Sequence, residues 1–187
     1  MKTLLKAGVA AAVVVGVVAL GGYIALADDN RNNNQIHVLD ECLPGDPGWD
    51  PTGGCTLKPH QGDVSFAEFG ALLRSTLTIP ANGFLIGHPA WRNEPAHLSV
   101  REGKTVRVTN KGGRGHTFTE VAEFGGGFVA QLNIGFNQAP ECSPATTIPL
   151  PAGATVDITD LAPGLHRFQC CIHPWMRATI HTHDDGH

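Results

Sequence analysis

The sequence predicts an all-β fold, a sandwich of short strands with a single short helix. In the second half of the chain, apolar and polar residues alternate with a period of two, as expected for strands with one buried face. Glycine-rich turns separate these segments, for example between residues 111 and 115. Six segments are predicted strands: 97–101, 105–109, 117–121, 154–159, 164–170 and 177–181. Many short strands with regular turns and almost no helix indicate a β-sandwich.

The first residues have the pattern of a secretory signal. Lys2 and Lys6 precede an apolar run, and Ala25-Leu-Ala27 offers a small-residue cleavage site. We therefore expect residues 1–27 to be a signal peptide and the mature protein to be periplasmic or extracellular. The alternative is an uncleaved membrane anchor, because the apolar stretch is also long enough to span a bilayer.

Composition limits the choice of partners. The chain has 187 residues and a formal net charge of −4, and loss of Lys2 and Lys6 would make that charge −6. No basic patch is evident, so nucleic acid is not an expected partner. The mature length suits one domain with its own core, and we expect a monomer.

Residues 28–95 are predicted to form an N-terminal extension. A polar tether at 28–34 leads into a short edge strand at 35–39. Cys42 and Cys55 flank a loop dense in proline and glycine, and we expect these two cysteines to pair and staple that loop.

A short helix follows the stapled loop. Ser65 and Glu68 have the spacing of a capping box, in which each side chain bonds a backbone N–H at the helix start. Apolar residues at helical spacing then predict a helix over 66–75. We interpret this helix as a lid packed on the domain.

The cysteine count points to one unpaired thiol. The chain has five cysteines, and an odd number in an exported protein leaves one of them over. If Cys42 pairs with Cys55, Cys142 can pair with either Cys170 or Cys171. Adjacent residues in a strand point to opposite faces, so these two thiols can serve different purposes.

Three potential metal ligands lie within seven residues near the C-terminus. Cys170, His173 and Met176 supply a thiolate, an imidazole and a thioether. A blue (type 1) copper site takes one Cys, two His and a weak axial Met. His116, in Gly115-His116-Thr117, is the candidate for the second imidazole.

These motifs resemble those of the cupredoxin superfamily, in particular its amicyanin- and plastocyanin-like blue copper proteins. The spacing of Cys170, His173 and Met176, followed by Arg177, resembles the short ligand loop of the amicyanin type. The stretch from Asn110 to His116 resembles the loop and strand start that carry the upstream His. The resemblance covers about half of the chain.

The resemblance implies a cupredoxin-like Greek-key β-sandwich over residues 96–183, with one type 1 copper at one end and a tail at 184–187. It implies His116, Cys170, His173 and Met176 as ligands, which leaves Cys171 for Cys142. It also implies that Asn110 braces the ligand loops. The expected function is that of an exported one-electron carrier between redox proteins, not an enzyme.

Other functions remain open at this point. The same ligands could hold Cu(I) for delivery, without an electron-transfer role. Cys170, Cys171, His173 and His116 could instead form a tetrahedral zinc site. A multicopper enzyme would need further histidine motifs, but the sequence has a single His-x-His pattern, His181-Thr-His183. This histidine-rich tail is itself a minor candidate for a weak second metal site. A stapled sandwich without metal is the purely structural alternative.

Overall fold

The structure is a computed structural model that describes residues 34–76, 87–133 and 135–184. The predicted signal peptide, nearly all of the tether and the last three residues lie outside these ranges. Within the described part of the chain, no helix is both long and apolar enough to cross a bilayer.

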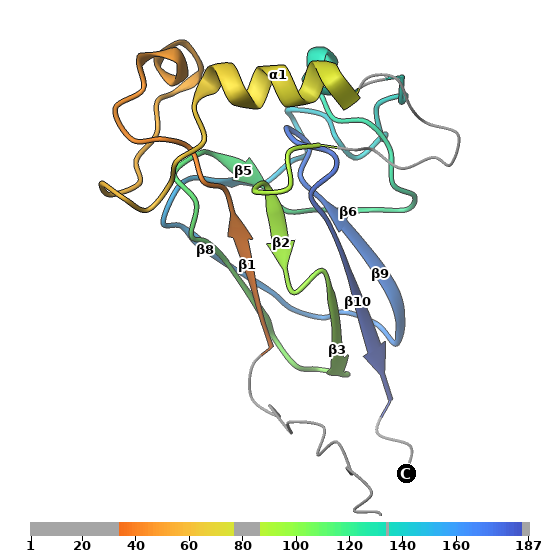
Figure 1. The fold of residues 1–187 in the computed structure, drawn as a ribbon. Coiled ribbons are helices and arrows are strands. Elements are labelled where there is room, and N and C mark those ends of the chain that lie inside the picture. Colours follow the sequence, from red (N-terminus) through yellow and green to blue (C-terminus); the bar gives the residue numbers. More distant parts are fainter. Residues whose placement is uncertain (1–33, 77–86, 134, 185–187) are drawn as a thin grey trace, which may run out of the picture. The chain divides into compact units, whose positions relative to one another are not determined.

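Two four-stranded sheets and one short pair make up the β-structure (Figure 1). The first sheet has the order β2 (Arg92–Glu94), β1 (Gln35–Leu39), β4 (Val106–Asn110) and β8 (Thr155–Ile158). The second has the order β3 (His97–Arg101), β10 (Arg177–His183), β9 (Gly164–Gln169) and β6 (Thr119–Val121). The pair joins β5 (His116–Thr117) to β7 (Pro149–Leu150).

The core lies between the two large sheets. Each sheet contributes its buried apolar face, and both sets belong to one contiguous cluster: Ile36, Val38, Val106 and Val108 from the first sheet, with Val100, Phe168, Ala178 and Ile180 from the second. Most strands that follow one another along the chain lie in different sheets, as Greek-key connections require. The predicted all-β sandwich is therefore confirmed.

One predicted edge strand is in fact internal. β1 lies between β2, to which it is antiparallel, and β4, to which it is parallel. Ile36 and Val38 are fully buried. The prediction was wrong because no strand was expected in the proline-rich segment before residue 97. That segment forms β2, which covers the second edge of β1. The N-terminal segment thus supplies two strands to the same sheet as β4 and β8.

The predicted strand at 117–121 is two strands in different sheets. His116 pairs with Leu150 in β7, whereas Thr119 pairs with Gln169 in β9. Between them Phe118 is buried and stacks on Phe168 at a centroid distance of 4.7 Å. This switch places His116 beside the end of β9, where Cys170 follows.

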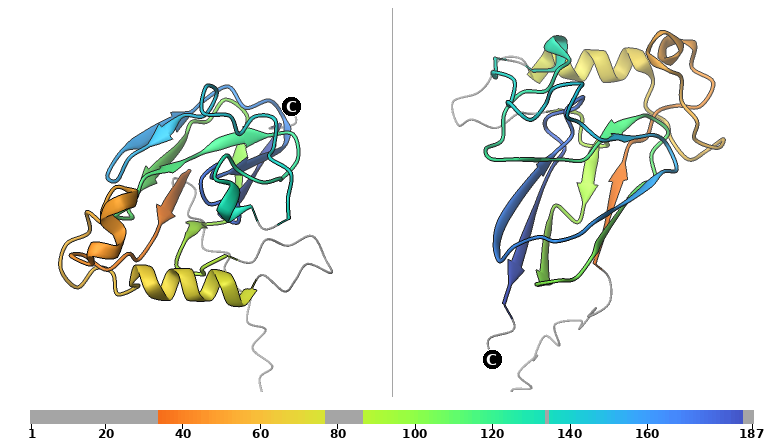
Figure 2. Two further views of the ribbon diagram at one scale, coloured as in Figure 1. Left: turned by 90° about the horizontal axis from the view of Figure 1, so that it is seen from above. Right: turned by 180° about the vertical axis from the view of Figure 1, so that it is seen from behind.

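The predicted helix is confirmed as α1 (Phe66–Thr76). The Ser65 hydroxyl accepts a hydrogen bond from the backbone N–H of Glu68, as in a capping box. Phe69 is buried and packs on Trp49 of the 3₁₀ helix η1 (Pro47–Thr52). Figures 1 and 2 show α1 across one end of the sheets, near the 3₁₀ helix η2 (Ala130–Leu132).

Two disulfides form among the described cysteines. Cys42 pairs with Cys55, and Cys142 pairs with Cys171. Cys170 is free and buried. Its side chain belongs to the main core, while Cys171 belongs to a second, smaller cluster with Cys142. The two adjacent thiols therefore do face different environments.

Candidate metal centre

The structure brings His116, Cys170 and His173 together. The potential ligand atoms of these three buried residues all lie within 4.8 Å of one another. In the described ranges no other group of three or more His, Cys, Asp and Glu side chains meets this criterion. Two of the residues are 54 positions apart in sequence, so the fold has to assemble the cluster.

The three side chains are spaced as a metal would require. The Nδ1 atoms of His116 and His173 each lie 3.8 Å from the Cys170 Sγ. Metal bonds of about 2.3 Å to sulfur and about 2.05 Å to nitrogen, opened to about 120°, separate the two ligand atoms by about 3.8 Å. Both sulfur-to-nitrogen distances therefore match those expected around a trigonal ion.

The loop after β9 is closed by its own backbone. The N–H of Cys170 donates to the carbonyl of Met176 at 3.0 Å, and the N–H of Met176 donates to that of His173 at 2.9 Å. This tight turn holds Cys170 and His173 on one side of the loop. Met176 is only 1% exposed and packs in the same core cluster as Cys170.

The surroundings of the Cys170 sulfur stabilise a thiolate. It accepts backbone N–H groups from Thr117 and His173, both at 3.4 Å. Burial alone would raise the pKa of this thiol, but hydrogen bonds from the rings of His116 and His173 outweigh it and hold the pKa well below its usual value. A thiolate is the form that binds metals.

Asn110 braces the turn that leads into His116, but its side-chain hydrogen bonds do not reach the loop from Cys170 to Met176. Its amide donates to the carbonyls of Arg114 and Leu150, at 2.7 and 2.9 Å. Its carbonyl oxygen accepts the N–H of Gly112 at 2.9 Å. Since Asn110 is fully buried, all three bonds form away from water and fix the chain that leads into His116.

Sequence reasoning missed Asp40. Its Oδ2 lies 2.8 Å from the Nε2 of His116, and both side chains are completely buried. Burial alone would lower the pKa of His116, but the bonds to Asp40 and Cys170 raise it to about 9. A single acid at the end of a strand, 76 positions from its partner, gives no local signal.

Aromatic side chains cover His173. Its ring lies 5.4 Å from that of Trp175, 6.3 Å from that of Phe69 and 6.4 Å from that of Trp91, measured between centroids. His173 itself is only 6% exposed. Burial lowers the pKa of its imidazole, which therefore stays neutral at pH 7. Helix α1 acts here as the predicted lid.

A cavity of about 720 Å³ lies against this cover, and His173 forms part of its wall. Its other walls come from α1, η1, η2 and the loop after Cys170. The apolar lining includes Trp49, Phe66, Phe69, Leu73, Leu132 and Ile172. The volume is in the range typical of ligand pockets.

Other candidates are not brought to this cluster. Cys171 is bonded to Cys142, so the tetrahedral zinc set that included Cys171 does not form. His88, another buried histidine near the aromatic cover, packs on Phe69, and its Nδ1 accepts the backbone N–H of Ala90. His181 and His183 lie on β10 and not in a tail, their rings are 6.3 Å apart, and they form no cluster of three with another described ligand.

Comparison with solved structures finds similarity to cupredoxins and to a copper enzyme. A purple cupredoxin from Nitrosopumilus maritimus aligns with 79% of this chain and 97% of its own, with 15% identity and a TM-score of 0.39. A reduced amicyanin variant aligns with 56% and 86%, with 18% identity and a TM-score of 0.35. A copper-containing nitrite reductase from Thermus scotoductus aligns with 49% of this chain but 20% of its own, with 24% identity and a TM-score of 0.34.

No family model matches the chain, and no curated protein matches it. The structural similarities are too low to place the chain in a family.

Proposed function

We propose that this protein binds one type 1 copper ion through His116, Cys170, His173 and Met176 and acts as an exported one-electron carrier. The observation that carries this proposal is the placement of two imidazole Nδ1 atoms, each 3.8 Å from one buried thiolate. A thiolate, two imidazoles and a nearby thioether form the donor set of blue copper sites. Bound copper would supply a one-electron couple between Cu(II) and Cu(I).

The protein's own contribution is a fixed and dry ligand set. The three donors are held by backbone hydrogen bonds and packing rather than by the metal, so a change of oxidation state would meet little reorganisation. The aromatic cover leaves His173 only 6% exposed. By the family resemblance, His173 is the route for electrons, and here its ring borders the cavity under α1.

The burial of the site favours electron transfer over copper delivery. A delivery protein has to release its ion to a partner, which requires ligands that the partner can reach. His116, Cys170 and His173 are each at most 6% exposed. An electron, unlike an ion, can leave a closed site.

Two disulfides support an exported location. Disulfides persist in oxidising compartments, and the pairs Cys42–Cys55 and Cys142–Cys171 agree with the secretory pattern at the N-terminus. The described residues hold a single candidate metal cluster, whereas a multicopper enzyme needs several. We therefore propose a carrier that exchanges electrons with redox partners, and no reaction on a substrate.

The test is a visible spectrum of the mature protein after addition of Cu(II), with copper counted per chain. We expect an intense blue or purple thiolate-to-copper band at one copper per chain, reversibly bleached by one electron. The variant Cys170→Ser should lose the band, while Met176→Leu should keep a band with altered position and potential. A wild-type protein without the band would overturn the copper assignment, and a band that cannot be cycled would favour delivery.

A further inference from the structure

The N-terminal segment contributes a buried carboxylate that touches a proposed ligand. Asp40 follows β1 directly and precedes the stapled loop. Its Oδ2 lies 2.8 Å from the Nε2 of His116, on the opposite side of the ring from the nitrogen that faces Cys170. His116 is thus held between one carboxylate and one thiolate.

The position of Asp40 is fixed by several donors. Its Oδ1 accepts the backbone N–H of Gly113 at 3.0 Å, and its Oδ2 accepts that of Arg114 at 3.0 Å. A longer bond of 3.4 Å comes from the N–H of Cys42. With His116 as a further donor, this buried carboxylate has the partners that a charge needs in the interior.

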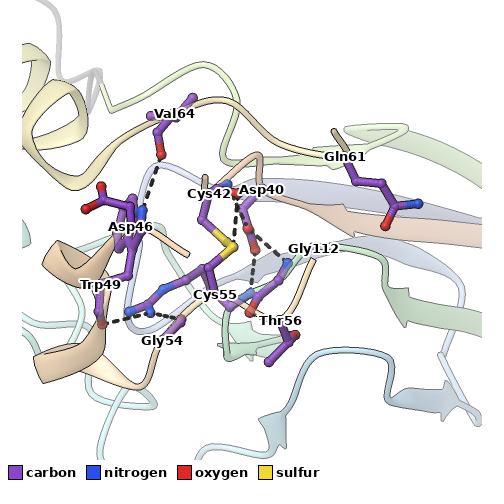
Figure 3. The surroundings of a disulfide bond; sticks show 12 residues. Asp40, Cys42, Asp46, Trp49, Gly54, Cys55, Thr56, Gln61, Val64 and Gly112 are labelled. Atoms are coloured by element: carbon purple, nitrogen blue, oxygen red, sulfur yellow. Dashed lines mark hydrogen bonds between the residues drawn. A yellow bond between two sulfur atoms is a disulfide. The ribbon is translucent and has the colours of Figure 1, made fainter. Parts of the chain in front are cut away.

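The turn before His116 packs closely against Asp40. Gly112 has no room for a side chain, because a Cβ there would overlap the carboxylate of Asp40 (Figure 3). The backbone N–H of Lys111 donates to Val38 at 2.8 Å, and that of Thr56 donates to Gly113 at 3.0 Å. The turn before His116 is therefore wrapped around the end of β1 and the disulfide loop.

We propose that Asp40 is a positioning residue of the metal centre. It orients His116 so that Nδ1 faces Cys170, and it places a buried negative charge behind that ligand. This inference rests on the copper function proposed above. A carboxylate bonded to the outer nitrogen of a ligating imidazole fixes the tautomer and makes the imidazole a stronger donor.

The charge has a defined effect on the copper couple. Cu(II) carries one more positive charge than Cu(I), so a fixed negative charge nearby favours the oxidised form. Asp40 therefore lowers the reduction potential of the centre. The N-terminal segment, which lies outside the stretch whose sequence motifs resemble the family, becomes part of the site through this one side chain.

The experiment compares copper-loaded Asp40→Asn with wild type and with Asp46→Asn. Asp46 lies in the same stapled segment and also accepts backbone N–H groups, but from Gly48 and Phe66 at 2.9 and 2.7 Å. We expect Asp40→Asn to weaken Cu(II) binding about 10–100-fold relative to Cu(I) binding. That loss corresponds to a potential about 59–118 mV more positive, because tenfold is 59 mV for one electron.

The outcomes separate this inference from the copper assignment. If wild type lacks the blue band, the copper proposal fails. If wild type has the band and Asp40→Asn has the same potential, Asp40 is structural only and the inference is overturned. Asp46→Asn should leave the potential unchanged, and an equal shift in both variants would also overturn it.

A second measurement needs no variant. In ¹⁵N NMR spectra of the protein loaded with diamagnetic Cu(I), or left free of metal, His116 should show a protected proton on Nε2. Absence of that proton, or copper bound through Nε2, would overturn the inference even if Asp40→Asn fails to fold.

Discussion

The hydroxyl of Thr117 accepts a hydrogen bond of 2.7 Å from the backbone N–H of Cys171. This bond joins the strand that carries His116 to the loop that carries Cys170 and His173. Both partners are buried, so water cannot replace the bond if it is lost. The two halves of the site are therefore held in register by a residue that is itself not a proposed ligand.

The variant Thr117→Val should weaken the connection between the strand of His116 and the loop of Cys170. It keeps the side-chain volume but leaves the buried N–H of Cys171 without an acceptor, which costs about 1–3 kcal/mol. Urea unfolding of the metal-free protein measures the loss, and a broadened visible band would report a looser site. Thr109→Val is the matched control, because the Thr109 hydroxyl bonds an exposed Thr155 and its loss should cost less than about 0.5 kcal/mol. Equal losses in both variants would contradict this role of Thr117.

Removing the disulfide beside the site should affect stability but not the identity of the thiolate ligand. The double variant Cys142→Ser with Cys171→Ser opens a loop with a sequence separation of 29 residues. A loop of that length predicts a loss of about 3–4 kcal/mol in the free energy of unfolding. The blue band should persist, because Cys170 is untouched. Its disappearance in a variant that still folds would point to Cys171 as the ligand.

Copper uptake should depend on pH through His116. The pKa of this imidazole is raised to about 9 in the metal-free protein, so below pH 9 a proton competes with copper for its Nδ1. The pKa values of Cys170 and His173 are both lowered, which reduces the competition from protons at these two ligands. We expect the apparent Cu(I) affinity to rise by about tenfold per pH unit from pH 7 toward pH 9 and then to level off.

The measurement is a competition titration with a Cu(I) chelator at several pH values, corrected for the chelator's own protonation. At pH 7 about one proton should be released per copper bound. An affinity that is flat between pH 7 and pH 9 would show that His116 binds copper without losing a proton.

Filling the cavity under α1 should slow electron exchange without altering the centre. Leu73→Trp places a large side chain in the cavity that His173 borders. We expect severalfold slower reduction by hydroquinone in stopped-flow experiments, with an unchanged visible spectrum. Leu165→Trp is the control, because Leu165 is 53% exposed on β9 and should leave the rate unchanged. Equal rates in both variants would mean that electrons reach the site by another path.

Features that depend on neighbouring residues could be predicted from the sequence. The capped helix α1, the Cys42–Cys55 pair and most strands of the sandwich follow from spacing, turn residues and periodicity. The turn from Cys170 to Met176 is also a local feature, because the hydrogen bonds that close it span only a few residues.

The tertiary structure alone decided the long-range relationships. It placed β1 inside the sheet and divided the predicted strand at Phe118, and it confirmed the pair of Cys142 with Cys171 that the resemblance implied. It also put Asp40 against His116, across 76 positions. Periodicity shows which face of a segment is buried, but not which strand becomes its neighbour. That choice depends on register and packing between distant segments, and it determines which carboxylate lies behind the imidazole.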